Sequence, residues 1–426
     1  MRKNILALVA TAAAFQCLSG TFTFAQSESA QFPVTTPHRF QVKNPPLIVH
    51  DDRSIEARRA VVTRNANTPG SQQLPVWNYQ TVSSRDGFLY QGVIVGSNPN
   101  QRGSSATVNV RMQVVPIVLN FHRIGTAVDL NTGVITTTSG DASSNPTVPD
   151  TGCFAGSNNV PLTLFTQSPI LKTADFNFGG TDVGTAQYTD AFQRANLWSL
   201  IDKNNYHVHL NPQILPAIVA DVPAVSGLSL AADVFAPAFT MCSPEGLVDI
   251  NFLDALVVSE LTQIKGINPG TFPTFMIYNT GMSIGDPTNL NNCCAGGYHS
   301  ISPAGPLTFQ TYSPFDFDVS GFFVPSANDT AIVSHEVAEW INDPYIINNT
   351  PAWGNIGQVA GCQGNLEVGD PLTGTEAPRI VGKNGFTYHL QELAFFSWFF
   401  GNPSLGIHGW DSDNGTFLTD AGPPCQ

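Results

Sequence analysis

Apolar and polar residues alternate along two runs early in the chain, residues 88–95 and 107–119, as they do in half-buried β-strands. A polar, turn-forming cluster at residues 97–104 separates the two runs, so the pattern predicts a β-hairpin. A further turn at residues 131–133 precedes a third run that is rich in Val, Ile and Thr. We therefore expect the first half of the chain to be mostly β-structure.

Helical periodicity begins later in the chain. Apolar side chains recur at helical spacing in residues 189–200 and 249–264. A third such segment, residues 326–342, ends before Asp343-Pro344, because proline disfavours helix in the residue that precedes it. Residues 388–400 are apolar nearly all round, which predicts a buried helix. Short strands are predicted at residues 206–210, 274–278, 298–301 and 307–312.

The first residues have the composition of a secretory signal peptide. Arg2 and Lys3 precede an apolar run at residues 5–15, and small residues follow near residue 25. The run is shorter than the roughly 20 residues of a membrane-spanning helix, so we expect a secreted, extracellular protein. The expected segments are a signal peptide (residues 1–25), an extended lead-in or pro-segment (26–85), a β-rich domain (86–240) and an α+β domain (241–426).

Six cysteines remain after the expected signal peptide, namely Cys153, Cys242, Cys293, Cys294, Cys362 and Cys425. An even number in an exported chain favours disulfides, but sequence alone does not select their connectivity. The adjacent Cys293 and Cys294 are expected to bond to different partners. The paired Cys-x-x-Cys spacing of structural zinc sites is missing from the sequence.

Composition and charge narrow the class of partner. The formal net charge is −14, and removal of Arg2 and Lys3 takes it to −16, which argues against a nucleic acid or an anionic membrane surface. Only 12% of the residues are charged, while Gly and Pro number 37 and 31, which indicates many turns and short strands. The composition is that of an extracellular globular protein.

The strongest chemical pattern is His335-Glu336-x-x-Glu339 on the helix predicted at residues 326–342. His335 and Glu339 are four residues apart and so share one helix face, and Glu336 is rotated by about 100° from His335. Zinc hydrolases hold a metal ion with two helix residues at this spacing and use the intervening glutamate as general base. The flanking residues are mostly apolar, and a buried cluster of this charge needs a cation or hydrogen bonds.

A third metal ligand must come from another segment. Glu367 and Asp370 lie in one short stretch after the helix, and Glu367 is preferred. Asp343 is on the same helix face as His335, but Pro344 follows it directly. Asp343 is therefore expected to lie in the turn that ends the helix and not to bind the metal ion. Imidazole and carboxylate are both zinc ligands, and three of them leave a position open for water.

These residues also resemble a known pattern. Ser334-His-Glu-x-x-Glu, Asn342-Asp-Pro, a Trp, Glu367-Val-Gly-Asp and the upstream Tyr298-His299 are similar to the series in secreted phosphate-induced (Exordium-like) proteins and their bacterial relatives. The resemblance covers about residues 245–400. It implies a zincin-like α+β domain in which His335, Glu339 and Glu367 bind the metal ion and Glu336 is the base.

The leading functional hypothesis is a secreted metal-dependent hydrolase, namely a peptidase with one Zn²⁺ ion. Glu336 would deprotonate the attacking water, and Tyr388, His389 or His299 would serve as the oxyanion partner. A peptide or protein substrate is expected along an edge strand, for which residues 307–312 are the candidate.

Two other hypotheses stay open. The first is a non-catalytic extracellular or cell-surface binding protein with a structural or vestigial metal site, because Glu339 replaces the usual second histidine. The second is a glycoside hydrolase that uses two of the four carboxylates, although the sequence suggests no aromatic sugar platform. His207 and His209 form a His-x-His pair that could bind a metal ion, but no third ligand is obvious nearby. We therefore expect them to be polar residues on one face of a strand.

Overall fold

A computed structural model describes residues 42–66, 73–103, 106–154, 159–324, 327–419 and 425. The expected signal peptide, residues 1–25, and parts of the expected lead-in lie outside these residues. The described residues belong to one compact unit that spans Phe40–Gln426. With 18% helix and 37% strand, they confirm the α+β class. No helix among them is long and apolar enough to span a membrane.

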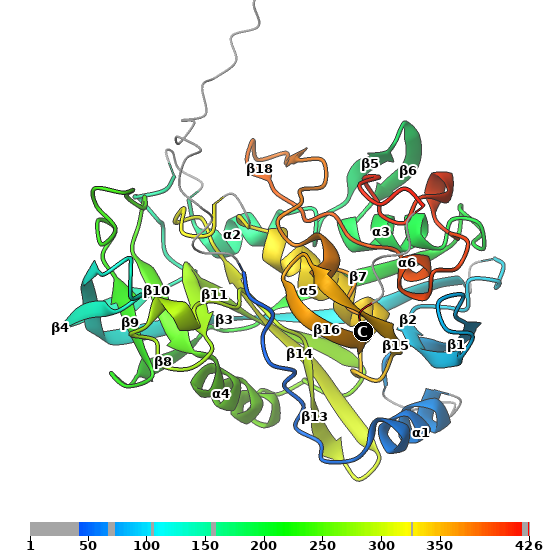
Figure 1. Ribbon diagram of the computed structural model, residues 1–426, viewed down its shortest axis with the longest axis horizontal. Helices are drawn as coiled ribbons and strands as arrows, with labels where there is room; N and C mark the ends of the chain where they lie inside the picture. The colour runs from blue at the N-terminus through cyan, green and yellow to red at the C-terminus, as the bar shows by residue number, and fades with distance from the viewer. Residues whose placement is uncertain are drawn as a thin grey trace, which may run out of the picture. The chain divides into compact units, whose positions relative to one another are not determined.

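A mixed ten-stranded sheet forms the centre of this unit (Figure 1). Seven strands follow one another in the order β12-β10-β9-β3-β11-β14-β13, and the other three pair with β3. The strands are β3 (Thr107–Val128), β4 (Ile135–Ser144), β7 (His207–Ile214), β8 (Ile218–Val222), β9 (Gly227–Leu230), β10 (Glu245–Asp249), β11 (Thr271–Tyr278), β12 (Thr280–Ser283), β13 (Ser300–Gly305) and β14 (Thr308–Phe317).

Strand β3 connects the two parts of the chain that the sequence analysis treats as separate domains. It pairs in parallel with β7 and β8 and, on its other side, with β11, where Val115 lies opposite Phe275. The sheet therefore includes strands from both sides of residue 240. Its outermost strand next to β14 is β13, so β14, which contains the expected substrate strand, is an interior strand.

Two helices cover opposite faces of this sheet, α5 (Ala331–Asn342) and α4 (Ile250–Gln263) (Figure 1). Phe272 and Met276 of β11 belong to the hydrophobic cluster that contains α5, whereas Phe275 and Ile277 belong to the cluster that contains α4. Successive strand residues point to opposite faces, so β11 is buried on both sides. This explains why its sequence is apolar without alternation.

The helix predictions succeed where periodicity is clear. The segment 249–264 forms α4, which begins where the Asp249 side chain accepts a hydrogen bond from the Asn251 backbone amide. The segments 189–200 and 326–342 form shorter helices than predicted, α3 (Tyr188–Asn196) and α5, and α5 ends before Asp343-Pro344. In the segment 388–400 only α6 (Phe396–Phe400) is helical, because burial all round does not require a helix.

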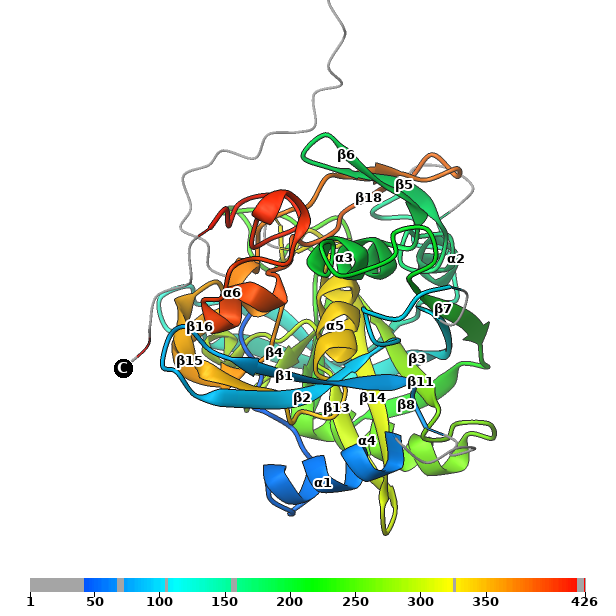
Figure 2. The same ribbon diagram turned by 90° about the vertical axis from the view of Figure 1, so that its right-hand side faces the viewer.

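The predicted hairpin of residues 88–95 with 107–119 is wrong. Both runs are strands, but β2 (Leu89–Val95) pairs with the preceding β1 (Val76–Val82) in a separate antiparallel pair (Figure 2). The turn between β1 and β2 is closed by hydrogen bonds from Ser83 and Gly87. Helix α1 (Ile55–Ala66) lies in the segment expected to be extended, whereas residues 42–50 are extended apart from a bend at His50.

The remaining elements are small. They comprise α2 (Pro161–Thr166), β5 (Ala174–Phe178) with β6 (Thr181–Ala186), β15 (Asn349–Ile356) with β16 (Val359–Asn365), β17 (Ile380–Val381) with β18 (Thr387–Tyr388), and 3-10 turns at Leu290–Asn292, Asp370–Leu372 and Ile407–Gly409.

The six cysteines lie in pairs at disulfide distance, Cys153 with Cys242, Cys362 with Cys425 and Cys293 with Cys294. The expectation of different partners for the adjacent cysteines is therefore wrong.

Candidate metal centre

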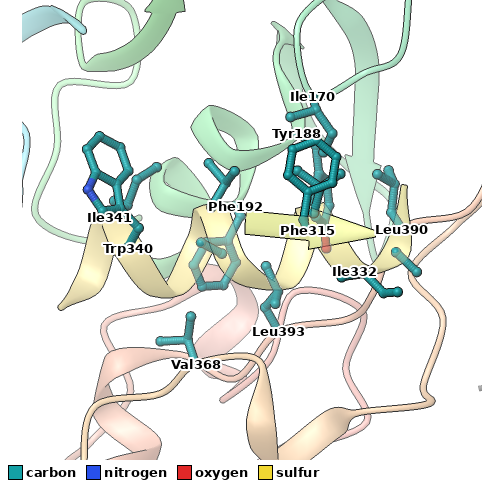
Figure 3. Close-up of a cluster of buried hydrophobic side chains, with 14 of the residues drawn as sticks. Ile170, Tyr188, Phe192, Phe315, Ile332, Trp340, Ile341, Val368, Leu390 and Leu393 are labelled. Atoms are coloured by element: carbon teal, nitrogen blue, oxygen red, sulfur yellow. The ribbon is translucent and has the colours of Figure 1, made fainter. Parts of the chain in front are cut away.

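Helix α5 presents His335, Glu336 and Glu339 from a position in the core where all twelve of its residues are buried. The helix's own apolar side chains, among them Ile332, Trp340 and Ile341, belong to the hydrophobic cluster that surrounds it (Figure 3). Trp340 stacks on Phe272 with ring centroids 3.7 Å apart, and its indole nitrogen donates a hydrogen bond to Thr311 at 3.0 Å. These contacts hold the helix against β11 and β14 and so fix the direction of its polar side chains.

The segment that carries Asp370 packs directly against the polar face of α5. Glu339 Oε1 lies 3.0 Å from His335 Nε2 and accepts hydrogen bonds from the backbone amides of Gly369 and Asp370. Asp370 Oδ1 is 3.5 Å from the same imidazole nitrogen. A Cβ atom at Gly369 would lie 2.5 Å from the His335 ring, so only glycine permits this approach. His335, Glu339 and Asp370 thus form a group with metal-ligand spacing.

A glutamine determines how His335 is oriented. Gln391 Oε1 lies 3.1 Å from His335 Nδ1, while the Gln391 amide nitrogen donates to the Gly369 carbonyl oxygen at 2.6 Å. With its amide nitrogen so engaged, Gln391 presents an acceptor to His335, so Nδ1 carries the proton. Nε2 then faces Glu339 and Asp370 and would be the nitrogen that takes a metal ion, an orientation common in histidines that bind metals.

His299, the residue before β13, forms a second group on the other side of Glu339. Its Nδ1 atom is 3.7 Å from Glu339 Oε2, and its Nε2 atom is 3.8 Å from Glu367 Oε2. The three side chains are buried and have metal-ligand spacing. From the sequence, His299 is expected only as an oxyanion partner. Its position before a buried strand, within the Tyr298-His299 dipeptide of the resemblance, is the signal that points to it.

The structure therefore brings all four sequence-predicted metal ligands together but divides them into two groups. Glu367 approaches His299, Asp370 approaches His335, and Glu339 belongs to both groups. Asp370 also accepts hydrogen bonds from Gln358 and Gln363, one on each oxygen. Glu367 accepts one from Asn365 on Oε1. A metal ion bound by either group would contact Glu339.

Three buried atoms of this centre have no hydrogen-bond partner, namely His299 Nε2, Glu336 Oε2 and Glu367 Oε2. No lysine or arginine among the described residues forms an ion pair with these carboxylates. Buried polar atoms are normally hydrogen-bonded, and buried charges are normally paired or bound to metal ions. The residues present thus fit a bound divalent cation.

The pKa shifts describe a centre that is crowded with negative charge. Burial raises the pKa of Glu336 to about 8, and burial and Glu339 raise that of Glu367 well above its ordinary value. Burial alone would raise the pKa of Glu339, but the two histidines lower it to about 2. Burial disfavours protonated His299, yet Glu367 and Glu339 raise its pKa to about 10. A divalent cation would neutralise the same charge.

A cavity of about 250 Å³ opens onto the centre. Its lining includes all five side chains of the two groups and Glu336, and also residues 44–48 of the extended N-terminal segment. That segment is held by hydrogen bonds from the Lys43 amide to the Cys294 carbonyl, from Asn44 to Gln363 and from the His50 amide to the Ile301 carbonyl. Val49 forms a parallel bridge with Ile301 at the outer edge of β13.

Tyr388 and His389 are not among the residues that line this cavity. The Tyr388 hydroxyl donates a hydrogen bond to the Leu164 carbonyl oxygen, and His389 Nδ1 pairs with Asp329. Asp343 accepts hydrogen bonds from the backbone amides of Ile347 and Asn348 in the turn that ends α5.

The His-x-His pair on β7 has a carboxylate neighbour that the sequence analysis does not identify. His207 Nδ1 is 2.8 Å from Asp190 Oδ2, and the rings of His207 and His209 stack 4.8 Å apart. The other oxygen of Asp190 accepts a hydrogen bond from the Val208 amide. These contacts join α3 to β7.

Comparisons of this chain with protein-family models, curated proteins and solved structures yield no match.

Proposed function

We propose that this protein is a secreted metal-dependent hydrolase, a peptidase that uses one Zn²⁺ ion held by the His335-Glu336-x-x-Glu339 helix. The observation that carries the proposal is the set of buried, unpartnered atoms of His299, Glu336 and Glu367 around Glu339. Imidazole nitrogens and carboxylate oxygens are the donors that zinc accepts at catalytic sites. A zincin-like domain, expected from the resemblance, belongs to this proposal.

The ligands would come from the two groups that share Glu339. His335 and Asp370 on one side, and His299 and Glu367 on the other, each complete a set of three with Glu339. Zinc bound here supplies Lewis acidity toward a carbonyl group. The mixed histidine and carboxylate donors leave less positive charge on the metal than three histidines would.

Glu336 would act as the general base. It lies on α5 next to His335, and its Oε2 atom has no hydrogen-bond partner, so it is available to take a proton from water. A Cβ atom at Gly297 would lie 2.7 Å from the Glu336 carboxyl group, so glycine there leaves room for the base. Burial of the carboxyl group excludes competing solvent.

A peptide substrate would bind in an extended form along the outer edge of β13. That edge ends beside the cavity, and Ile301 there already pairs with an extended segment of this chain. Main-chain pairing with an exposed strand is a common way to bind peptides. Secretion is supported by the three cysteine pairs, because disulfides persist in oxidising compartments.

Metal analysis combined with one substitution tests the proposal. We expect the purified protein to contain one zinc ion per chain and to cleave casein or a peptide library. Glu336→Gln should retain the zinc and lose at least about 100-fold in kcat, since general-base catalysis contributes about 10²–10⁴-fold. Glu376→Gln, which changes a carboxylate paired with Arg379, is the matched control and should leave the zinc content and kcat unchanged. A protein that binds no zinc would refute the site.

A second candidate function is non-catalytic binding with a structural metal ion. The observation that favours it is that residues 44–48 form part of the cavity wall and so occupy space beside the centre that a substrate would need. Zinc retained by a wild-type protein that cleaves no substrate in a broad panel would support this function over hydrolysis.

A further inference from the structure

A second cluster of acidic side chains lies in the core, at residues that the candidate metal centre does not use. Glu245, Asp316 and Asp318 are each 0% exposed. Each contributes a carboxylate oxygen, and these oxygens lie within 4.8 Å of one another. Carboxylates this close repel each other strongly unless protons or a cation intervene.

The chain builds this cluster from strand ends. Asp316 lies near the end of β14 and Asp318 just beyond it, so the alternation of strand side chains puts both on one face. Glu245 is the first residue of β10, which pairs in parallel with β12. The Thr280 amide, at the start of β12, donates a hydrogen bond to Asp316 Oδ1 at 3.1 Å. The register of the sheet therefore places the three carboxyl groups together.

Half of the six carboxylate oxygens in this cluster lack a hydrogen-bond partner. Both oxygens of Glu245 and Oδ2 of Asp316 are buried without one. Asp318 accepts from the backbone amides of Ser320 and Phe323, at 2.8 and 3.3 Å. No lysine, arginine or histidine among the described residues forms an ion pair with any of the three. A fully buried carboxylate that is neither paired nor hydrogen-bonded is costly.

We propose that Glu245, Asp316 and Asp318 bind a calcium ion that ties β10 to the end of β14. All available donors are oxygen atoms, which hard cations such as Ca²⁺ prefer, whereas zinc favours the histidines of the other centre. Oxygens within 4.8 Å of one another can surround a point at the Ca–O distance of about 2.3–2.6 Å. A bidentate Glu245 and backbone carbonyls or water would supply the further ligands that Ca²⁺ requires.

The electrostatics of the cluster agree with this role. Burial and the neighbouring carboxylates raise the pKa of Glu245 well above its ordinary value, and burial and Asp318 do the same for Asp316. A shared proton between Glu245 and Asp316 is therefore the alternative to a cation. The two differ in one measurable respect, because only the cation site makes stability depend on calcium concentration.

Calcium titration of the full chain, after treatment with a chelator, tests the proposal. We expect calorimetry to report saturable binding of one Ca²⁺ per chain, with Kd at or below about 1 mM as in extracellular modules. At about 100 times Kd, the melting temperature should rise by about 3 °C. Glu245→Gln should abolish both effects, whereas Glu339→Gln should retain them, since it alters only the zinc centre.

A wild-type protein without saturable Ca²⁺ binding would overturn the proposal. The alternative, a proton shared between Glu245 and Asp316, would then account for the cluster. Full binding in both Glu245→Gln and Asp316→Asn would also overturn it, because the ion would then lie elsewhere. If neither variant folds, the wild-type titration alone decides.

Discussion

At the scale of single residues, the orientation of His335 depends on Gln391. The side-chain amide nitrogen of Gln391 donates to the Gly369 carbonyl oxygen, and the Gln391 backbone amide donates to the Ser334 hydroxyl at 3.0 Å. Gln391→Leu keeps the approximate size but removes the acceptor for His335 Nδ1. Loss of such a supporting partner costs about 10–100-fold in metal affinity. We expect this decrease in a zinc competition assay, and Gln391→Glu, which keeps an acceptor, should recover part of it. Unchanged affinity in Gln391→Leu would contradict the assigned tautomer.

The pairing of His389 with Asp329 predicts a pH-dependent contribution to stability. The hydrogen bond to Asp329 raises the pKa of His389 above its ordinary value. The folded state then binds the proton more tightly, so the contribution is complete below the unfolded pKa of about 6.5 and is lost as pH rises through the folded pKa. Urea unfolding should show His389→Gln most destabilised near pH 6, with a smaller difference near pH 9. A difference that is constant with pH would exclude this linkage.

At the scale of elements, the packing of α5 should dominate local stability. Trp340 is fully buried between Phe272 and Thr311, so Trp340→Ala removes a stacked ring and a hydrogen bond. Such truncations cost about 3–5 kcal/mol. Chemical denaturation should show this loss, while Trp198→Ala, at a partly exposed ring that contacts Lys203, should cost much less. Equal effects of the two substitutions would show that α5 is not held by this contact.

The same elements show what could be predicted from the sequence. Helix α5 and its end were predictable because periodicity and Pro344 act locally, and the spacing of His335 and Glu339 follows from helix geometry. Strand pairing was not predictable from the sequence. Strand β2 pairs with β1 across a short turn, but the alternating pattern at residues 107–119 is stronger and favoured that run as the partner of β2. The sequence underestimates His299 as a metal ligand because its proximity to Glu339 depends on the packing of α5 against the sheet that contains β13 and β14. Long-range contacts of this kind leave no local pattern.

At the scale of the whole molecule, the N-terminal segment and the candidate centre are coupled. Residues 44–48 line the cavity, and Val49 occupies the edge of β13 where a peptide substrate is expected. His50 fixes the end of the segment through a 2.6 Å contact with Asp254 of α4, whose other oxygen accepts from Tyr298 and Tyr312. If a peptide binds along this edge as proposed, the segment and the substrate would compete for it, which is the behaviour expected of a pro-segment.

Two truncated chains, which differ only in residues 42–50, test this coupling. The chain that begins at Val42 keeps the segment over the cavity, and the chain that begins at Asp51 lacks it. We expect similar zinc content in both but faster peptide cleavage by the shorter chain, because its β13 edge and cavity are open to substrate. Circular dichroism should establish that both are folded. Should the shorter chain unfold, the full chain with Asn44→Ala and His50→Ala weakens both ends of the segment and should likewise gain activity. Equal cleavage rates in folded proteins would mean that residues 42–50 belong to the permanent wall of the cavity, so that substrate must reach Glu336 from another direction.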